Sequence, residues 1–204
     1  METSQISNEN EKICMIREAA KTIISGGVIV YPTETVYGIG ANALDEQAIL
    51  RVFQIKKRPM HMPIFLAVSS LEMLDRVAEI STDDREILKL LMPGPVSVLV
   101  RRKSVVPNVL TAGSPLVGIR FPDHEVALRI IDAAGPITST SANRTGLQSP
   151  ASADDISPEI ADGVEMVLDG GKCKFGQPST LLDLTNRKII RPGAELEKVQ
   201  RAIS

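Results

Sequence analysis

The stretch from Gly26 to Gly40 constrains the fold more than any other part of this chain. Val28 to Val30 form a short β-branched apolar run behind a Gly-Gly break, a pattern typical of a buried central strand. Pro32 cannot donate a hydrogen bond to a sheet, so this strand is expected to end there. The following loop carries hydroxyls, one carboxylate and glycines, and polar side chains at the end of a buried strand commonly face a ligand crevice. This loop is therefore the first candidate for a functional site.

Helical and strand-like patterns alternate along the chain, which predicts an α/β fold. Seven or eight strands are expected, in the segments 28–30, 63–68, 96–101, 116–121, 137–140, 164–168, 179–184 and 188–191. Thr185-Asn186 separates the last two segments and predicts an antiparallel hairpin, so the sheet is expected to be mixed. We expect one domain over residues 10–204 and a disordered tail over residues 1–9.

Capping patterns predict where the helices begin. Asn10 and Asp45 are suited to cap helices that end near Ser25 and before Pro59. Three capping boxes predict further helix starts, at Ser69 with Glu72, Ser81 with Asp84, and Ser152 with Asp155. The remaining predicted helices cover residues 124–134 and 195–203.

Composition limits the classes of function. The formal net charge is −2 and the pI is about 5.8, which argues against a generally basic nucleic-acid-binding surface. Cys14 and Cys173 are far apart and have no CxxC partner, which favours a reducing compartment over a disulfide framework or a zinc site. There is no signal pattern at the N-terminus, and no apolar run approaches the roughly 18 residues of a membrane helix. A cytoplasmic protein without a membrane segment is expected.

Gly38-Ile39-Gly40-Ala41-Asn42-Ala43 matches the dinucleotide pattern GxGxxA, but its context does not fit. The glycines lie several residues beyond the strand, and no acidic residue between Glu46 and Glu72 is present to bind a ribose. Glycines for tight turns and close packing are the better interpretation. His61 and His124 are expected in an exposed loop and at a helix start, and no cluster has the spacing of a metal site or a Ser-His-Asp relay.

Two polar clusters have both a structural and a functional explanation. Lys56 and Arg58 lie where a helix ends before a proline, and cations there complement the helix dipole. If this exit is extended, however, both side chains project to one side, as polyphosphate binding requires. Ser139, Ser141 and Asn143 share a face if the backbone after their strand stays extended, and a turn that satisfies its own backbone is the equal alternative.

Arg120 lies inside the apolar segment 116–121. A buried guanidinium needs a carboxylate partner or an anionic ligand, because desolvating it alone is expensive. Both explanations are open at this point, and a core carboxylate such as Asp183 is the candidate partner.

Seven motifs, spread over roughly residues 10–203, occur in the order found in the YrdC-like family of threonylcarbamoyl-AMP synthases, which the chain resembles. They are Tyr31-Pro32-Thr33-Glu34-Thr35-Val36-Tyr37-Gly38, Lys56-Lys57-Arg58-Pro59, Pro93-Gly94-Pro95, Val117-Gly118-Ile119-Arg120, Ser141-Ala142-Asn143, Ser179-Thr180 and Arg191-Pro192-Gly193. Each motif alone is weak evidence of the family, whereas seven motifs in the same order are highly specific for it. The length of the chain resembles that of the short, single-domain form of the family.

The resemblance implies a fold and a reaction. The fold is a twisted, open, mixed parallel and antiparallel sheet flanked by helices, with a large basic concave cavity. In the reaction, L-threonine, bicarbonate and ATP give threonylcarbamoyl-AMP and pyrophosphate, and Mg²⁺ is bound through the phosphates. A partner, the tRNA threonylcarbamoyl-transferase machinery, then transfers the group to adenosine 37 of tRNAs that read ANN codons.

The resemblance also implies a set of site residues. ATP would be held by Lys56, Arg58, Ser139, Asn143, Ser149 and Arg191, with Ser141 as part of the same signature. Threonine would be held by Thr33, Arg120, Ser141 and Ser179. No catalytic acid or base and no protein ligand for a metal is assigned; Lys56 and Arg58 would neutralise charge in the transition state, and Arg120 suits a bidentate grip on the threonine carboxylate. Glu34 is the one carboxylate of the loop, where a capping role is favoured over that of a base.

Two positions depart from the family pattern. Ala67 stands where members can carry a histidine close to the amino acid, and Met62 stands where a lysine is frequent. Contacts from the loop over residues 60–67 are therefore expected to differ, whereas the reaction is not.

Two other classes of function fit parts of the sequence. An RNA-binding module acting in tRNA or rRNA maturation would line a cavity with Lys56, Arg58, Arg101, Arg102 and Lys103. The acidic balance and the aromatic content of 3% argue against that as the main role, and direct RNA contact is kept as an alternative. A dinucleotide oxidoreductase lacks the acidic residue that would bind the ribose.

Overall fold

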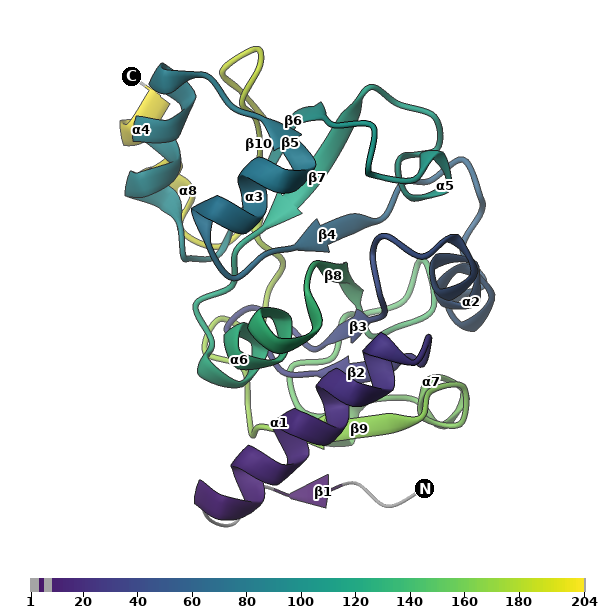
Figure 1. Ribbon diagram of the computed structural model, residues 1–204. Coiled ribbons are helices and arrows are strands. Elements are labelled where there is room, and N and C mark those ends of the chain that lie inside the picture. Colours follow the sequence, from purple (N-terminus) through teal and green to yellow (C-terminus); the bar gives the residue numbers. More distant parts are fainter. Residues whose placement is uncertain (1–3, 6–8, 204) are drawn as a thin grey trace.

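The computed structural model of the protein describes residues 4–5 and 9–203 (Figure 1). Its strands form one sheet and are β1 (Ser4–Gln5), β2 (Ile29–Tyr31), β3 (Gly38–Gly40), β4 (Phe65–Ala67), β5 (Ala78–Glu79), β6 (Val96–Arg102), β7 (Leu116–Arg120), β8 (Ile137–Ser141), β9 (Met166–Asp169), β10 (Thr180–Asp183) and β11 (Lys188–Arg191). Its helices are α1 (Glu9–Ile24), α2 (Glu46–Lys56), α3 (Leu71–Val77), α4 (Thr82–Leu91), α5 (Asn108–Thr111), α6 (Glu125–Ala134), α7 (Pro158–Ala161) and α8 (Leu196–Ile203), with a 3-10 turn at Ala153–Asp155.

The sheet is mixed, as predicted, and its strand order is β1-β9-β2-β3-β8-β4-β7-β6-β10-β11, with β5 paired to β6. Neighbouring strands are parallel in four pairs along this order, β1 with β9, β9 with β2, β4 with β7, and β6 with β10. The predicted hairpin is present, because β10 and β11 pair in antiparallel fashion. Figure 1 shows α1 and α6 beside the strands β2 and β3, while α4 and α8 lie together at the other end of the molecule.

The expectation of seven or eight strands is wrong, because the sheet has 11 strands among the described residues. The additional strands are β1 and β5, of two residues each, and β3. Of the tail expected over residues 1–9, Ser4–Gln5 form β1 and Glu9 begins α1. Residues 1–3 and 6–8 lie outside the described part of the chain.

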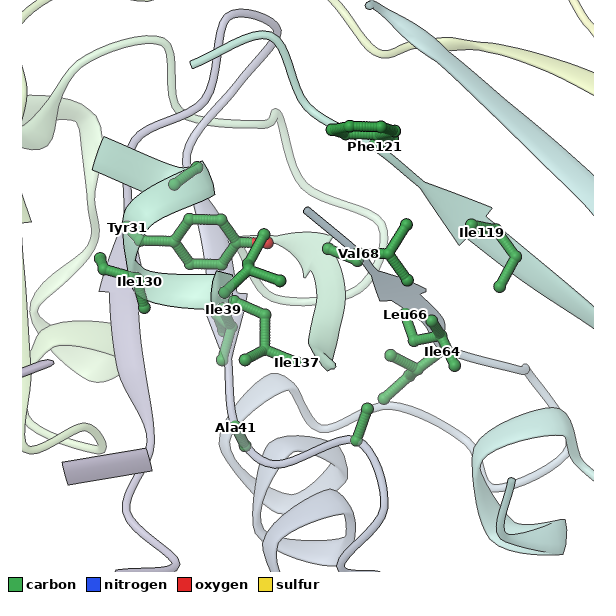
Figure 2. Close-up of a cluster of buried hydrophobic side chains, with 14 of the residues drawn as sticks. Tyr31, Ile39, Ala41, Ile64, Leu66, Val68, Ile119, Phe121, Ile130 and Ile137 are labelled. Atoms are coloured by element: carbon green, nitrogen blue, oxygen red, sulfur yellow. The ribbon is translucent and has the colours of Figure 1, made fainter. Parts of the chain in front are cut away.

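Strand β3 is the segment that the dinucleotide pattern GxGxxA had singled out. A Cβ atom at Gly38 would lie 3.0 Å from the ring of Tyr31, and one at Gly40 would lie 3.1 Å from it. The two glycines therefore let the fully buried Tyr31 ring of the neighbouring strand cross β3. Figure 2 shows this ring among Ile39, Ile130 and Ile137 in the apolar core.

Most predicted caps are present. The side chain of Asp45 accepts hydrogen bonds from two backbone N–H groups of α2, and that of Ser81 accepts one from Asp84. The capping box of Ser152 with Asp155 is present too. The cap of α3 is Ser70 rather than Ser69, because Ser70 is the residue whose hydroxyl accepts the hydrogen bond of Met73.

Candidate functional site

A cavity of about 220 Å³ lies where the loop after β2 meets the ends of several strands. It is lined by Tyr31, Thr33, Thr35, Val36, Tyr37, Gly38, Arg58, Pro63, Ile64, Phe65, Ser97, Arg120, Ser139, Thr140, Ser141, Ser149, Pro178, Ser179 and Arg191. Of the residues predicted for the site, only Lys56 and Asn143 are absent from this lining. The lining has three arginines and no carboxylate, so the cavity is basic.

The hydroxyl of Thr33 organises the loop that forms one wall of the cavity. It donates to the carbonyl of Val36 at 2.7 Å and lies 2.9 Å from the hydroxyl of Thr35. It also accepts from the backbone N–H groups of Thr35 and Val36, at 3.2 Å and 3.3 Å. Threonine hydroxyls commonly close turns in this way. The predicted role of Thr33 in binding an amino acid would therefore be shared with a structural role.

Arg120 forms a buried ion pair with Glu34, with its Nη2 atom 2.7 Å from Oε1 of the carboxylate. Both side chains are about 95% buried, since their exposed fractions are 5% and 4%. The candidate partner Asp183 is therefore wrong. It accepts hydrogen bonds from Thr185 and Asn186 in the β10–β11 turn instead. Sequence spacing could not show this pair, because 86 residues separate its members.

The donors of Arg120 are largely occupied. Its Nη1 atom donates to the carbonyls of Gly94 and Val96, and its Nη2 atom reaches Glu34 and, at 3.5 Å, the hydroxyl of Thr35. A bidentate grip on a ligand carboxylate through both terminal nitrogens would require at least one of these bonds to break. Glu34 also accepts a hydrogen bond from the backbone N–H of Asp123 at 2.9 Å. The ion pair therefore connects the loop after β2 with strand β7 and with the segment before α6.

Lys56 is buried at the end of α2, with an exposed fraction of 1%. Its Nζ atom donates to the carbonyl of Ser141 and, at 2.6 Å, to that of Asn143. The alternative of an extended exit after Lys56 does not occur, because Lys57 adopts the left-handed conformation as the cap of α2. Burial and the charge of Arg58 lower the pKa of Lys56 to about 7. Lys56 thus holds the backbone of the segment that carries Ser141 and Asn143.

Asn143 has one buried atom without a partner. Its Nδ2 atom donates to the carbonyls of Arg144 and Leu147, at 2.9 Å and 2.6 Å. Its Oδ1 atom is buried and has no hydrogen-bond partner. A buried acceptor of this kind is costly unless a ligand or water donates to it.

Arg58 and Arg191 are the unpaired arginines of the cavity, since no ion pair involves either within the described residues. Arg58 donates to the carbonyls of Met62 and Pro63, at 3.0 Å and 2.8 Å. Arg191 donates to the carbonyl of Ser179 at 2.9 Å and lies 3.4 Å from its hydroxyl. Burial lowers the pKa of both guanidiniums from the usual value.

The structure adds Ser97 to the residues predicted for the cavity, and it places Tyr31 and Thr35 of the loop over residues 31–38 in the predicted wall. Ser97 interrupts the apolar run of β6 directly after Pro93-Gly94-Pro95, and a polar residue at such a position was a usable signal. Its hydroxyl lies 2.8 Å from that of Ser179.

Other predicted residues lie away from the cavity. Arg101, Arg102 and Lys103 are not among its lining residues, so the RNA-binding arrangement that placed them there is wrong. Arg102 donates to Ser114, Val106 and Asn108 instead, and Lys103 donates to the carbonyl of Asp75. Ala67 is fully buried on β4 and pairs with Arg120 on β7, so it presents no side chain to a ligand.

The described residues contain neither a metal-binding cluster nor a membrane-spanning helix. No three His, Cys, Asp or Glu side chains gather in a group that could bind a metal ion. No helix in the same residues has the length and apolar character that crossing a membrane requires.

Comparison with curated proteins relates the sequence to synthases. A threonylcarbamoyl-AMP synthase of Pyrococcus abyssi is 40% identical over 205 residues, which cover 97% of this chain and 60% of that protein. A threonylcarbamoyl-AMP synthase of Cellvibrio japonicus is 32% identical over 179 residues, which cover 87% of this chain and 95% of that protein. The chain thus spans about 60% of the length of the first relative and most of the second.

Comparison with solved structures gives the same relationship. The crystal structure of P. abyssi Sua5 complexed with L-threonine matches with a TM-score of 0.91 and 38% identity, over 99% of this chain and 60% of that one. The crystal structure of E. coli YciO matches with a TM-score of 0.84 and 25% identity, over 95% of this chain and 96% of that one. The predicted fold class is therefore confirmed.

A family model named Sua5_yciO_yrdC and described as "Telomere recombination" matches residues 21–193, which is most of the chain. This match agrees with the curated relatives and with the shared fold. The protein belongs to the Sua5/YciO/YrdC family.

Proposed function

We propose that this protein is an L-threonylcarbamoyladenylate synthase, a nucleotidyltransferase that forms threonylcarbamoyl-AMP and pyrophosphate from L-threonine, bicarbonate and ATP. One observation carries the proposal. Residues predicted from motifs scattered along the sequence line one basic cavity, namely Thr33, Arg58, Arg120, Ser139, Ser141, Ser149, Ser179 and Arg191. The names of both curated relatives agree with the proposal. The product would be used by a tRNA threonylcarbamoyl-transferase machinery.

The proposed chemistry has two bond-forming steps. The threonine ammonium first loses a proton, and its nitrogen attacks the carbon of bicarbonate. A C–N bond forms and water leaves, which gives a carbamate. An oxygen of the carbamate then attacks the α-phosphorus of ATP, and the bond from that phosphorus to the bridging oxygen breaks as pyrophosphate departs. Both steps depend mainly on positioning and charge neutralisation, because ATP itself supplies the leaving group.

The unpaired arginines are the groups that would neutralise the triphosphate. Arg58 and Arg191 each retain donors and have no carboxylate partner, so an anionic ligand is the natural partner of both. Lys56 would add its charge from behind Ser141, and the unpartnered Oδ1 atom of Asn143 would accept a hydrogen bond from the nucleotide. Mg²⁺ would be held by phosphate oxygens, where it spreads the negative charge.

Proton transfer would not use Glu34. This carboxylate is absent from the cavity lining and is paired with Arg120, so it does not face the amine of a bound amino acid. The lining contains neither a carboxylate nor a histidine. The proton of the ammonium would therefore pass to solvent or to the substrates.

Pyrophosphate release from ATP tests the proposal. Release is expected only when L-threonine and bicarbonate are both present, and mass spectrometry should identify threonylcarbamoyl-AMP in the same samples. Omission of either substrate, and replacement of L-threonine by D-threonine, are the controls. Pyrophosphate release that does not depend on both substrates would refute the proposal.

A further inference from the structure

Among the described residues, two buried polar atoms of neighbouring segments have no hydrogen-bond partner. One is Oε2 of Glu34, the carboxylate oxygen that does not bond to Arg120, and the other is Nδ1 of His124. Neither Glu34 nor His124 is a lining residue of the cavity. A buried polar atom without a partner is costly, so we expect both atoms to take part in a hydrogen bond.

The carboxylate of Glu34 lies directly against the segment that carries His124. Its Oε1 atom accepts a hydrogen bond from the backbone N–H of Asp123 at 2.9 Å, and His124 is the next residue. The imidazole lies beside the turn after β9, because a Cβ atom at Gly170 would be 3.6 Å from its Cε1 atom. The same Cβ atom would be 2.5 Å from Pro32, two residues before Glu34. The ring and the carboxylate therefore lie together between the loop after β2 and the start of α6.

His124 is neutral at about pH 8 and then has a single ring N–H. Burial lowers the pKa of the imidazole below its ordinary value, and the charge of Glu34 is the largest effect that opposes this lowering. The other charged groups that act on the ring are Glu125 and Asp123, which raise its pKa, and Lys12, which lowers it. The hydrogen can be on Nδ1 or on Nε2, and the hydrogen bonds of the two nitrogens decide which one carries it.

We propose that His124 is a positioning residue, whose Nδ1–H group donates to Oε2 of Glu34, directly or through one water molecule, and thereby holds the carboxylate that pairs with Arg120. Solvent can serve Nε2, which is not among the buried unpartnered atoms of the described residues. Each oxygen of Glu34 then has a donor, since Oε1 accepts from Arg120 and from the backbone of Asp123. Arg120 lines the cavity, so the place of its guanidinium depends on a histidine that does not.

The consequence for substrate binding rests on the proposed function, in which threonine lies beside Arg120. A hydrogen bond to a charged group is worth about tenfold or more in affinity, and part of this is expected to reach the amino acid through Arg120. We therefore expect His124→Leu to raise the KM for threonine by about threefold to tenfold and to change the KM for ATP by less than about twofold. A fall in kcat with both KM values unchanged would contradict a positioning role at Arg120.

Two amide variants locate the donor. The amide nitrogen of His124→Asn can lie near the place of Nδ1, whereas that of His124→Gln reaches the place of Nε2. Asn should therefore restore most of the threonine affinity that is lost in His124→Leu, and Gln should not. Urea unfolding of all three variants controls for stability, because Asn is also a good cap for α6. Rescue by Gln in place of Asn, or by both equally, would overturn the proposal.

NMR tests the hydrogen bond itself without any substrate. The chain has two histidines, His61 and His124, so ¹⁵N-labelled imidazoles give few signals, and His61→Asn assigns them. At about pH 8 Nδ1 of His124 is expected to carry the hydrogen, whereas the exposed His61 should carry it on Nε2, the ordinary tautomer. Hydrogen on Nε2 of His124, with Nδ1 bare, would overturn the proposal.

These results separate the role of His124 from the proposed function. If Nδ1 carries the hydrogen but pyrophosphate release does not depend on threonine, the proposed function fails and the hydrogen bond to Glu34 stands. If release depends on threonine but Nε2 carries the hydrogen, the proposed function stands and the role of His124 fails. His61→Asn is the kinetic control, and it should change neither KM value by more than about twofold.

Discussion

Two kinds of arginine line the same cavity. Arg120 is held by Glu34 in a buried ion pair, and both of its terminal nitrogens are bonded to protein atoms. Arg58 is partly exposed and Arg191 is exposed. Neither has a carboxylate partner among the described residues, and both donate only to carbonyls and a serine hydroxyl. The first arginine is stabilised by the fold itself, whereas the other two retain a charge that a ligand can neutralise.

Under the proposed function, this difference separates the expected place of the triphosphate from that of the amino acid within one small cavity. A triphosphate carries the larger charge and is expected to bind where the arginines are unpaired. An amino acid carries both an ammonium and a carboxylate, so it fits better beside an arginine whose charge is already balanced. Substituting one arginine of each kind tests whether they differ in this way.

The largest expected effect is on the paired arginine. Arg120→Met leaves the buried Glu34 carboxylate without a cation and should lower the free energy of unfolding by about 3–5 kcal/mol. Urea unfolding measures this loss, and adding Glu34→Gln to the variant should recover part of it. Arg51→Met, which breaks the partly exposed Arg51–Glu165 pair, is the control and should cost about 1 kcal/mol or less. Equal losses of unfolding free energy in Arg120→Met and Arg51→Met would contradict the claim that the buried Arg120–Glu34 pair matters more to stability than the partly exposed pair.

An unpaired arginine should affect substrate use more than stability. Arg58→Ala should weaken ATP use by about 1.5–3 kcal/mol, the value of a hydrogen bond between charged groups, while unfolding changes little. The half-saturating concentration of ATP measures this effect in the pyrophosphate assay. Arg129→Ala, on the exposed face of α6, is the control. Unchanged kinetics in both Arg58→Ala and Lys56→Ala would mean that these two residues only complement the C-terminal end of α2 and do not bind ATP.

The cavity wall at Gly38 and Tyr31 depends on close packing. Gly38→Ala places a methyl group 3.0 Å from the Tyr31 ring and should lower the free energy of unfolding by about 1–3 kcal/mol. Thermal unfolding measures the loss, and Tyr31→Leu in the same chain should relieve part of it by removing the ring. A variant as stable as the wild type would show that the ring does not require the glycine.

The last effect, measured per pH unit, is a pH dependence from Lys56. Its folded pKa of about 7 lies below the ordinary 10.5, so between these values the unfolded chain binds a proton that the folded chain lacks. The free energy of unfolding should therefore rise with pH in this window, by at most about 1.4 kcal/mol per pH unit, relative to Lys56→Met. Below pH 7 the difference between the two proteins should be constant. Parallel stability curves from pH 7 to 10 would contradict this behaviour.

Local sequence patterns predicted much of the fold. The buried strand before Pro32, the cap at Asp45 and the β10–β11 hairpin are all present, because each depends on neighbours in the sequence. Strand β3 was missed, because Gly38 and Gly40 are poor strand formers on their own. They are required there by the Tyr31 ring of the next strand, and only the folded structure shows that ring.

Family motifs marked several residues that the structure brings together in one cavity, whereas contacts between distant residues were missed. Arg58, Arg191 and Ser179 lie together in the cavity. The partner of Arg120 was assigned to Asp183, since no local rule connects residues 34 and 120. Lys56 was expected to face a ligand, but the left-handed cap at Lys57 directs its amine to the carbonyls of residues 141 and 143.

A crystal structure with a non-hydrolysable ATP analogue and L-threonine tests most directly whether the paired and the unpaired arginines bind different substrates. The triphosphate is expected to contact Arg58 and Arg191, and threonine is expected beside Arg120 and Thr33 with the Arg120–Glu34 pair still formed. A triphosphate bound to Arg120, with the bond to Glu34 broken and Arg58 and Arg191 free of ligand, would contradict the account.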